Sequence, residues 1–144
     1  MARLYARSAT KINTKETRNL DVLFSEYIRR RAITEVGGCE RCLTPKYNIT
    51  NENGDIFPAW KHLQCSHFHG RASRSVRWDE DNASGLCGAC HIYVTAHPIE
   101  HVEWFKERLG DRFDLLQARA RTPARYIDRE AIKLYYKAKI EELK

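Results

Sequence analysis

Four of the five cysteines occur in two pairs that have the spacing of metal-binding knuckles. Cys39 and Cys42 form the first pair, and Cys87 and Cys90 form the second. A Cys-x-x-Cys pair places two thiolates on one tight turn, and zinc prefers four nitrogen or sulfur ligands in a tetrahedron. The two pairs together therefore predict one structural zinc ion that joins distant parts of the chain.

The fifth cysteine, Cys65, lies between the pairs and is expected to be a free thiol or an alternative ligand. We expect an intracellular protein, because the first residues lack the apolar stretch of a signal peptide. Thiols stay reduced inside cells, so metal binding is favoured over a disulfide framework. Structural zinc contributes on the order of 10 kcal/mol to folding in small peptide sites, and we expect the middle of this chain to need it.

The segment between the cysteine pairs carries residues suited to acid–base chemistry. His67 is the candidate general base, since a neutral imidazole with a pKa of about 6.5 can accept a proton from water. His69 lies two residues on, hence on the same face of an extended segment, and is a second candidate for metal or phosphate contact. Asn82 should hold a turn through side-chain hydrogen bonds to the backbone and so help to orient His67. His91 follows the fourth cysteine directly and is the candidate ligand of a catalytic divalent ion.

Another interpretation of these histidines is that they only complete or support the zinc site. Four cysteines already satisfy zinc, which favours a separate role for His67 and His91. The histidines expected to be structural or exposed to solvent are His62, His97 and His101.

Positive charge is concentrated near the start of the chain. The formal net charge is +6 and the pI is about 9.2, and residues 1–31 hold eight basic against three acidic side chains, a net of +5. Phosphate contacts supply most non-specific affinity for nucleic acids, so this asymmetry predicts DNA binding. The candidate DNA contacts are Arg29, Arg30 and Arg31 in a predicted helix, and Arg71, Arg74 and Arg77 in the loop after His67. A solvated basic surface is the alternative for both groups.

The apolar pattern predicts an α+β fold. Leu20, Phe24 and Ile28 recur at helical spacing, which indicates a helix over residues 14–32. Short strands are expected near residues 47–49 and 56–57 around the turn at Asn53-Gly54, with a further extended segment over residues 61–68. Helices are predicted over residues 90–95, 98–109, 111–120 and 128–143.

In combination, these motifs resemble a known nuclease family. Residues 39–91 are similar to the HNH, or ββα-metal, nucleases of the treble-clef zinc-finger type. More narrowly, the chain resembles the phage NinG (Rap) recombination nucleases over about residues 36–144. The segments that carry this likeness are Cys65-Ser66-His67-Phe68, residues 76–82, Cys87-x-x-Cys90-His91 and Ala124-Arg125-Tyr126.

The resemblance implies a zinc-stapled ββα-metal core with flanking helices, and a catalytic Mg²⁺ or Mn²⁺ at His91. It implies a metal-dependent DNA endonuclease that acts on branched recombination intermediates such as Holliday junctions and D-loops. A homodimer follows, since symmetric resolution of a junction takes two active sites. One departure is Ser66, which stands where many HNH nucleases have a metal-binding aspartate. The carboxylates that could replace it are Asp55, Asp79 and Asp81.

These features predict three parts of the chain. Residues 1–35 form a basic arm and helix, residues 36–97 a zinc-bound HNH-like core, and residues 98–144 a helical region. No run approaches the roughly 20 apolar residues needed to span a bilayer, and the mean hydropathy is −0.63, so we expect a cytoplasmic protein, in the bacterial host if phage-encoded. The alternative from another functional class is a non-catalytic zinc-finger DNA-binding protein. A zinc deaminase is disfavoured, because its His-x-Glu or Cys-x-Glu and Pro-Cys-x-x-Cys motifs are absent.

Overall fold

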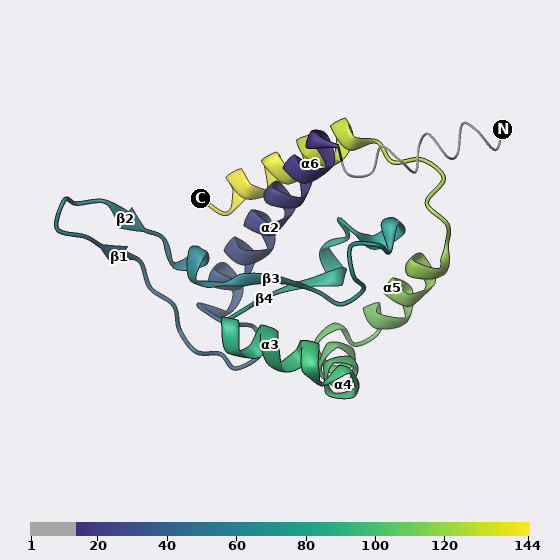
Figure 1. Ribbon diagram of the computed structural model, residues 1–144, viewed down its shortest axis with the longest axis horizontal. Coiled ribbons are helices and arrows are strands. Elements are labelled where there is room, and N and C mark those ends of the chain that lie inside the picture. Colours follow the sequence, from purple (N-terminus) through teal and green to yellow (C-terminus); the bar gives the residue numbers. More distant parts are fainter. Residues whose placement is uncertain (1–13) are drawn as a thin grey trace.

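A computed structural model describes residues 14–144, and it confirms the α+β class (Figure 1). Five α-helices and two small antiparallel sheets form this part of the chain. The helices are α2 (Lys15–Val36), α3 (Gly88–Ala96), α4 (Pro98–Leu109), α5 (Arg112–Arg121) and α6 (Arg129–Glu142). The strands are β1 (Ile49–Thr50), β2 (Ile56–Phe57), β3 (Gln64–His67) and β4 (Ala83–Leu86). In Figure 1, the β1–β2 hairpin extends away from the other elements, whereas β3 and β4 lie between α2 and α3.

Helix α2 supplies one wall of the core. Thr14 caps it as the sequence pattern indicates, because its hydroxyl accepts a hydrogen bond from the Thr17 N–H at 3.3 Å. The expected end at residue 32 is wrong, and the helix continues to Val36. It ends only where Gly37 adopts a left-handed φ of 74°. The predicted apolar stripe is confirmed, and its buried members are Leu20, Phe24, Tyr27 and Ile28.

Helix α6 packs along α2 and completes the first core cluster. Asp128 caps α6 as predicted, accepting a hydrogen bond from the Ala131 N–H at 2.9 Å. Tyr136 and Ile140 are buried in this cluster together with Trp78. The Tyr136 hydroxyl also donates a hydrogen bond to the Trp78 carbonyl. The last helix thereby fixes the loop that leads from β3 to β4.

Strands β3 and β4 lead directly into α3 and form a ββα unit. The strands pair antiparallel, with His67 opposite Ala83, and Cys87 alone separates β4 from α3. Strand β4 lies very close to α2, because a Cβ atom added at Gly85 would be 2.7 Å from the Ala32 Cβ. Glycine at this position therefore sets the distance between the sheet and the helix.

The other elements lie close to their predicted positions. Helix α4 spans Pro98–Leu109 as expected, and Gly54 has the positive φ, 83°, predicted for the hairpin turn. The extended segment over residues 61–68 is shorter than expected, since a 3₁₀ turn over Ala59–His62 precedes β3. Helices α4 and α5 enclose Val76 in a separate core cluster. Among residues 14–144, no helix has the length and apolar character that a membrane span requires.

Candidate functional site

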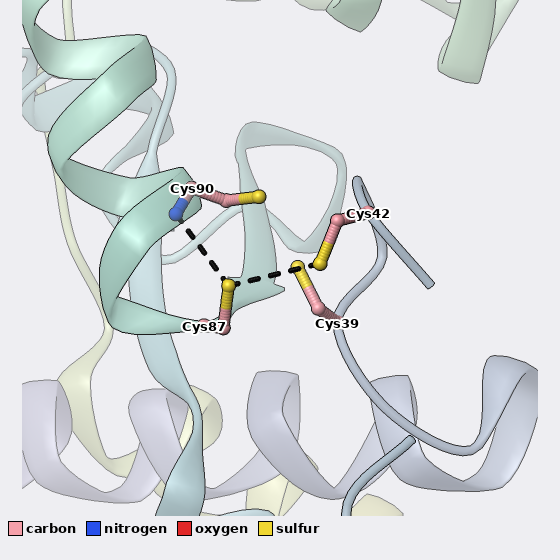
Figure 2. A group of neighbouring side chains, drawn as sticks. All are labelled: Cys39, Cys42, Cys87 and Cys90. Atoms are coloured by element: carbon pink, nitrogen blue, oxygen red, sulfur yellow. Dashed lines mark hydrogen bonds between the residues drawn. The ribbon is translucent and has the colours of Figure 1, made fainter. Parts of the chain in front are cut away.

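The four knuckle cysteines come together, as Figure 2 shows. Their sulfur atoms all lie within 4.8 Å of one another, and the Cys42 and Cys87 sulfurs are 3.8 Å apart. Zn–S bonds of about 2.3 Å give a tetrahedron with edges of about 3.8 Å. All five cysteines are free thiols, so no disulfide accounts for the cluster. The four residues therefore fit the predicted structural zinc.

The backbone of two turns positions these sulfurs. After α2, Leu43 takes a left-handed φ of 62°, and its N–H donates to the Cys39 carbonyl at 2.9 Å. The Cys39 N–H donates to the Thr44 carbonyl at 3.2 Å, which closes the first knuckle. In the second knuckle, Cys87 is the N-cap of α3, and its sulfur accepts a hydrogen bond from the Cys90 N–H at 3.5 Å.

The surroundings of the sulfurs are those of a cation site. A hydrogen bond with the Thr44 hydroxyl lowers the pKa of Cys42 to about 6. Burial raises the pKa of Cys90 to about 12, although Arg41 lies 3.5 Å from its sulfur and acts in the opposite direction. Burial also raises the pKa of Cys39. A bound metal ion would supply the positive charge that these buried thiolates need.

Glu40 links the first knuckle to two other elements, a role that the sequence pattern does not reveal. Its side chain is only 6% exposed and accepts a hydrogen bond from the Gly85 N–H of β4. Arg108 of α4 donates to the same carboxylate at 2.9 Å, and Arg31 of α2 lies 3.9 Å from it. Because the two closest partners, Gly85 and Arg108, are 45 and 68 residues away, no local signal identifies this residue.

His67 lies at the end of β3 and faces α2, with its ring centroid 5.7 Å from that of Phe24. Burial lowers the pKa of His67 below its ordinary value, and the positive charge of Arg71 lowers this pKa further. The imidazole is therefore neutral near pH 7, as a general base must be. Its Nε2 atom is buried and has no hydrogen-bond partner within the described chain.

Asn82 is fully buried and directs both ends of its amide to one residue. Its Oδ1 accepts a hydrogen bond from the His69 N–H at 2.8 Å, and its Nδ2 donates to the His69 carbonyl at 2.9 Å. The Phe68 N–H also donates to the Asn82 carbonyl at 2.8 Å. The Asn82 side chain thus bonds to backbone as expected, but across the β3–β4 loop beside His67; its own turn is capped by Asp79, which accepts a hydrogen bond from the Asp81 N–H at 3.0 Å.

His91 lies in the N-terminal half of α3 and contacts the start of β3. Its Nδ1 is 2.6 Å from Oε1 of Gln64, and its Nε2 has no hydrogen-bond partner among residues 14–144. The charge of a protonated His91 would lower the pKa of His67 less than burial and Arg71 do, and the two histidines lie toward opposite ends of β3, His91 against its first residue and His67 as its last. Sequence reasoning missed Gln64, because only the packing of α3 on β3 brings it to His91.

His69 does not share a face with His67, and that prediction is wrong. Strand β3 ends at His67, so the strand alternation does not extend to His69. The His69 Nε2 instead lies 2.5 Å from Oε1 of Gln117 on α5. The three histidines expected to be structural or exposed pack on aromatic rings, His62 on Phe57, His97 on Tyr93 and His101 on Phe68.

Two of the six arginines predicted to contact DNA are buried and structural. Arg31 is 8% exposed and donates to the carbonyls of Glu80 and Ala83 at 2.7 and 2.8 Å. Arg77 is 7% exposed and forms two hydrogen bonds with the Asp21 carboxylate, at 3.0 and 2.6 Å. Because both guanidinium groups are buried and bonded to groups inside the fold, the assignment of Arg31 and Arg77 to DNA is wrong.

The other two arginines of α2 surround Trp60. The guanidinium carbons of Arg29 and Arg30 lie 4.6 and 4.8 Å from the ring centroid, and Arg30 pairs with Glu26 at 2.9 Å. They do not emerge from the last turn of α2, since the helix continues past them to Val36. The remaining basic residues of the predicted arm, in residues 1–13, lie outside the described residues.

Arg71 and Arg74 remain able to contact a ligand. The Arg71 side chain is 64% exposed, lies 3.8 Å from Asp21, and is close enough to His67 to lower its pKa. Arg74 lines a cleft between α5 and α6. Both belong to the loop that follows His67.

The carboxylates proposed to replace an aspartate at position 66 are engaged elsewhere. Asp79 and Asp81 form ion pairs with Arg119 at 2.6 and 3.1 Å, and Asp55 accepts a hydrogen bond from Asn51 in the hairpin. The carboxylate whose charge acts on His67 is Asp21 of α2, which raises the pKa of that imidazole. Asp21 and His67 are 46 residues apart in the sequence, so no short sequence motif contains both residues.

The arrangement combines a sulfur cluster that could hold a metal ion with a neutral, partly buried imidazole and a second imidazole on the adjoining helix. An exposed arginine lies next to the first imidazole. These groups can bind a phosphate, hold a divalent ion and accept a proton. In comparisons with known proteins, the chain matches no family model, no curated protein and no solved structure.

Proposed function

We propose that the protein is a metal-dependent DNA endonuclease of the HNH type, related to the phage NinG nucleases. The observation that carries this proposal is the ββα unit of β3, β4 and α3, which carries His67 at the end of β3, Asn82 just before β4 and His91 on α3, and whose helix begins at the candidate zinc cluster. Asn82 closes the loop between the two strands beside His67, and His91 contacts Gln64 at the start of β3. The order His, Asn, His along the chain is the one that the resemblance to HNH nucleases implies.

In this proposal, His67 is the general base. A neutral imidazole nitrogen accepts a proton from a water molecule, whose oxygen then attacks the phosphorus of a phosphodiester. The bond from phosphorus to one ester oxygen breaks, and that oxygen leaves and takes a proton from solvent. Burial keeps the pKa of His67 low, so the base form is present at neutral pH without a proton having to be removed first.

His91 is the residue that would hold a divalent ion. Its Nδ1 is oriented by Gln64, which leaves the Nε2 atom for the metal, an arrangement common among metal-bound histidines. Mg²⁺ or Mn²⁺ at this position would stabilise the charge that develops on the phosphate and the leaving oxygen. Such ions keep several water or phosphate oxygens as ligands, so one protein side chain need not complete the shell.

Arg71 is placed to bind the phosphate beside His67. Its guanidinium is largely exposed, and Asp21 lies 3.8 Å away on its protein side. Arg77 holds Asp21 from the buried side at 2.6 Å, so the carboxylate provides a fixed anchor for the exposed arginine. Bidentate donors of this kind suit phosphate oxygens.

For the substrate we propose branched DNA, and for the assembly a homodimer. The net charge of +6 and the exposed Arg71 suit a polyanion, and the resemblance to NinG nucleases favours Holliday junctions or D-loops. Two active sites related by a two-fold axis would cut a symmetric junction on both sides.

A specific observation favours the second candidate, a non-catalytic zinc-finger DNA-binding protein. Ser66 replaces the metal-binding aspartate, and the carboxylates of Asp55, Asp79 and Asp81 all have partners elsewhere. A zinc cluster and exposed arginines would suffice for this function.

Cleavage of labelled substrates separates the two candidates. The protein is incubated with linear duplex, flap and four-way DNA, with and without Mg²⁺ or Mn²⁺, beside a His67→Ala variant of equal zinc content. The nuclease proposal expects ion-dependent nicking that the variant lacks. Tight DNA binding with no nicking in either ion would instead establish the non-catalytic protein.

A further inference from the structure

A cleft of about 930 Å³ opens where the chain passes from α5 to α6. Its walls are the end of α5, the irregular segment over residues 122–128 and the start of α6, and this segment runs along the right-hand edge of Figure 1. Arg74 and Trp78 reach it from the loop that begins after His67. The cleft is therefore separate from the histidine site but joined to it by one loop.

Three arginines and two aspartates line the cleft, a net charge of +1. Arg74 and Arg125 line it, and neither has an ion pair or hydrogen bond within residues 14–144. The Nε atom of Arg74 is buried without a partner. The acids in the cleft are already engaged, since Asp79 pairs with Arg119 at 2.6 Å and Asp128 caps α6. An anionic ligand would thus meet two available guanidinium groups.

The cleft also presents an exposed aromatic ring. Tyr126 is 83% exposed, more than any other large apolar or aromatic side chain among the described residues. Next to it, Pro123, Ile127 and Ile132 provide an apolar surface. An aromatic ring beside free cations is the combination by which proteins bind single-stranded nucleic acids, with bases stacked on rings and phosphates held by arginines.

Duplex DNA fits this cleft poorly. Its bases are stacked on one another and offer only their edges, whereas an unpaired strand can place a base face on Tyr126. We propose that the cleft binds a short single-stranded segment of DNA, with Tyr126 stacked on a base and Arg74 and Arg125 bound to neighbouring phosphates. The use of such binding in selecting a branched substrate rests on the proposed nuclease function, whereas the binding itself does not.

Binding is measured by fluorescence anisotropy with a labelled oligodeoxynucleotide of about 12 nucleotides, a length within the usual site sizes. A duplex of the same sequence is the comparison, and no Mg²⁺ or Mn²⁺ is added. For Tyr126→Ala, the Kd for the single strand should rise about 5- to 100-fold, because one stacked base is lost. Tyr126→Phe should bind like the parent protein, since it keeps the ring.

Two further variants test the location and the cations. Tyr47→Ala removes a tyrosine that is 72% exposed on the hairpin side of the molecule, and it should leave the Kd unchanged. Arg125→Gln should reduce the slope of log K against log salt by about 0.7, the value for one phosphate contact on a single strand. Equal zinc content and equal circular dichroism establish that each variant is folded.

The outcomes distinguish this inference from the nuclease proposal. If Tyr126→Ala binds the single strand as tightly as the parent protein, the inference about the cleft is overturned, whether or not the protein cleaves DNA. If the parent protein cuts no substrate but Tyr126→Ala alone loses single-strand binding, the nuclease proposal fails and the cleft remains a DNA site. Equal losses for Tyr47→Ala and Tyr126→Ala would also overturn the assignment to this cleft.

Discussion

The four-cysteine cluster and the histidine site both include part of the ββα unit, but they are held together in different ways. Each cysteine pair is fixed by its own turn, through bonds such as those of Leu43 to Cys39 and Cys90 to Cys87. The histidines rely on partners from other segments, with Gln64 at His91 and Phe24 at His67. The first site is therefore local in construction and the second is tertiary.

Because of this difference, we expect the sulfur cluster to contribute to folding stability and the histidines to contribute to reactivity. The sulfur cluster joins the turn after α2 to the start of α3, so its loss should free that turn from the junction of β4 with α3. The histidine side chains lie at the edge of the unit and are partly exposed. Their removal should leave the fold in place and change only reactivity.

The largest expected effect is that of removing one zinc ligand. Cys87→Ala should abolish zinc binding and cooperative folding, because structural zinc contributes on the order of 10 kcal/mol, as much as the whole stability of a typical domain. Elemental analysis should find about one zinc per parent chain and none in the variant. Circular dichroism then reports the loss of structure.

Cys65→Ala is the matched control, because Cys65 is partly buried but lies outside the sulfur cluster. It should retain the zinc. A Cys87→Ala protein that stays folded without metal would show that the cluster is not what holds the unit together.

Removal of the proposed base should give the next largest effect. His67→Ala is expected to lower the cleavage rate by roughly 10²- to 10⁴-fold while zinc content, folding and DNA affinity stay close to those of the parent protein. His91→Ala should also stop cleavage, but a higher concentration of Mg²⁺ or Mn²⁺ should partly restore it, because the defect is in ion affinity.

Single-turnover cleavage over a range of ion concentrations measures both variants. Added ion should not help His67→Ala. Loss of zinc from that variant, or cleavage at the parent rate, would show that the two sites are not separable in the way described.

The buried Arg31 and the exposed Arg71 should also differ in their effects on stability and on DNA binding. Arg31→Ala should lower the free energy of unfolding by about 3 kcal/mol, because it removes two charged hydrogen bonds to buried carbonyls. Arg71→Ala should change it by no more than about 0.5 kcal/mol. Urea denaturation measures both values.

For DNA binding, Arg71→Ala should have a larger effect than Arg31→Ala. Arg71→Ala should reduce the salt slope for duplex binding by about 1, as expected for one lost phosphate contact. If a folded Arg31→Ala protein shows the same reduction in the salt slope of duplex binding, Arg31 contacts DNA after all.

The smallest expected effect is a shift in pH dependence. Burial lowers the pKa of His67, so its neutral form is active at pH 7 and the cleavage rate should fall only at a pH below about 6.5. The free energy of unfolding should also decrease as the pH falls. The unfolded chain binds this proton more readily, so the folded state loses stability as the pH falls from about 6.5 towards the lowered pKa.

A pH–rate profile with zinc content followed at each pH tests this expectation. The residual activity of His67→Ala should lack that acid limb. An acid limb centred above pH 6.5 in the parent protein would assign the titration to another group.

Local patterns predicted much of the framework. The Thr14 and Asp128 caps, the span of α4 and the cysteine knuckles each depend on residues a few positions apart, and all are present. The end of α2 was placed too early, because no residue between 32 and Gly37 interrupts a helix. Helix caps and tight turns can be predicted from sequence because the residues that form them lie within about one turn of the chain.

By itself, the sequence determined which four cysteines could hold a metal ion, the α+β class and the identity of the candidate histidines. Only the tertiary structure decided that Arg31 and Arg77 are buried, that His69 turns towards α5, and that Gln64, Glu40 and Asp21 support the sites. The reason is physical. An arginine in a sequence carries the same charge whether it faces water or a buried carboxylate, and its partner is chosen by the packing of elements far apart in the chain.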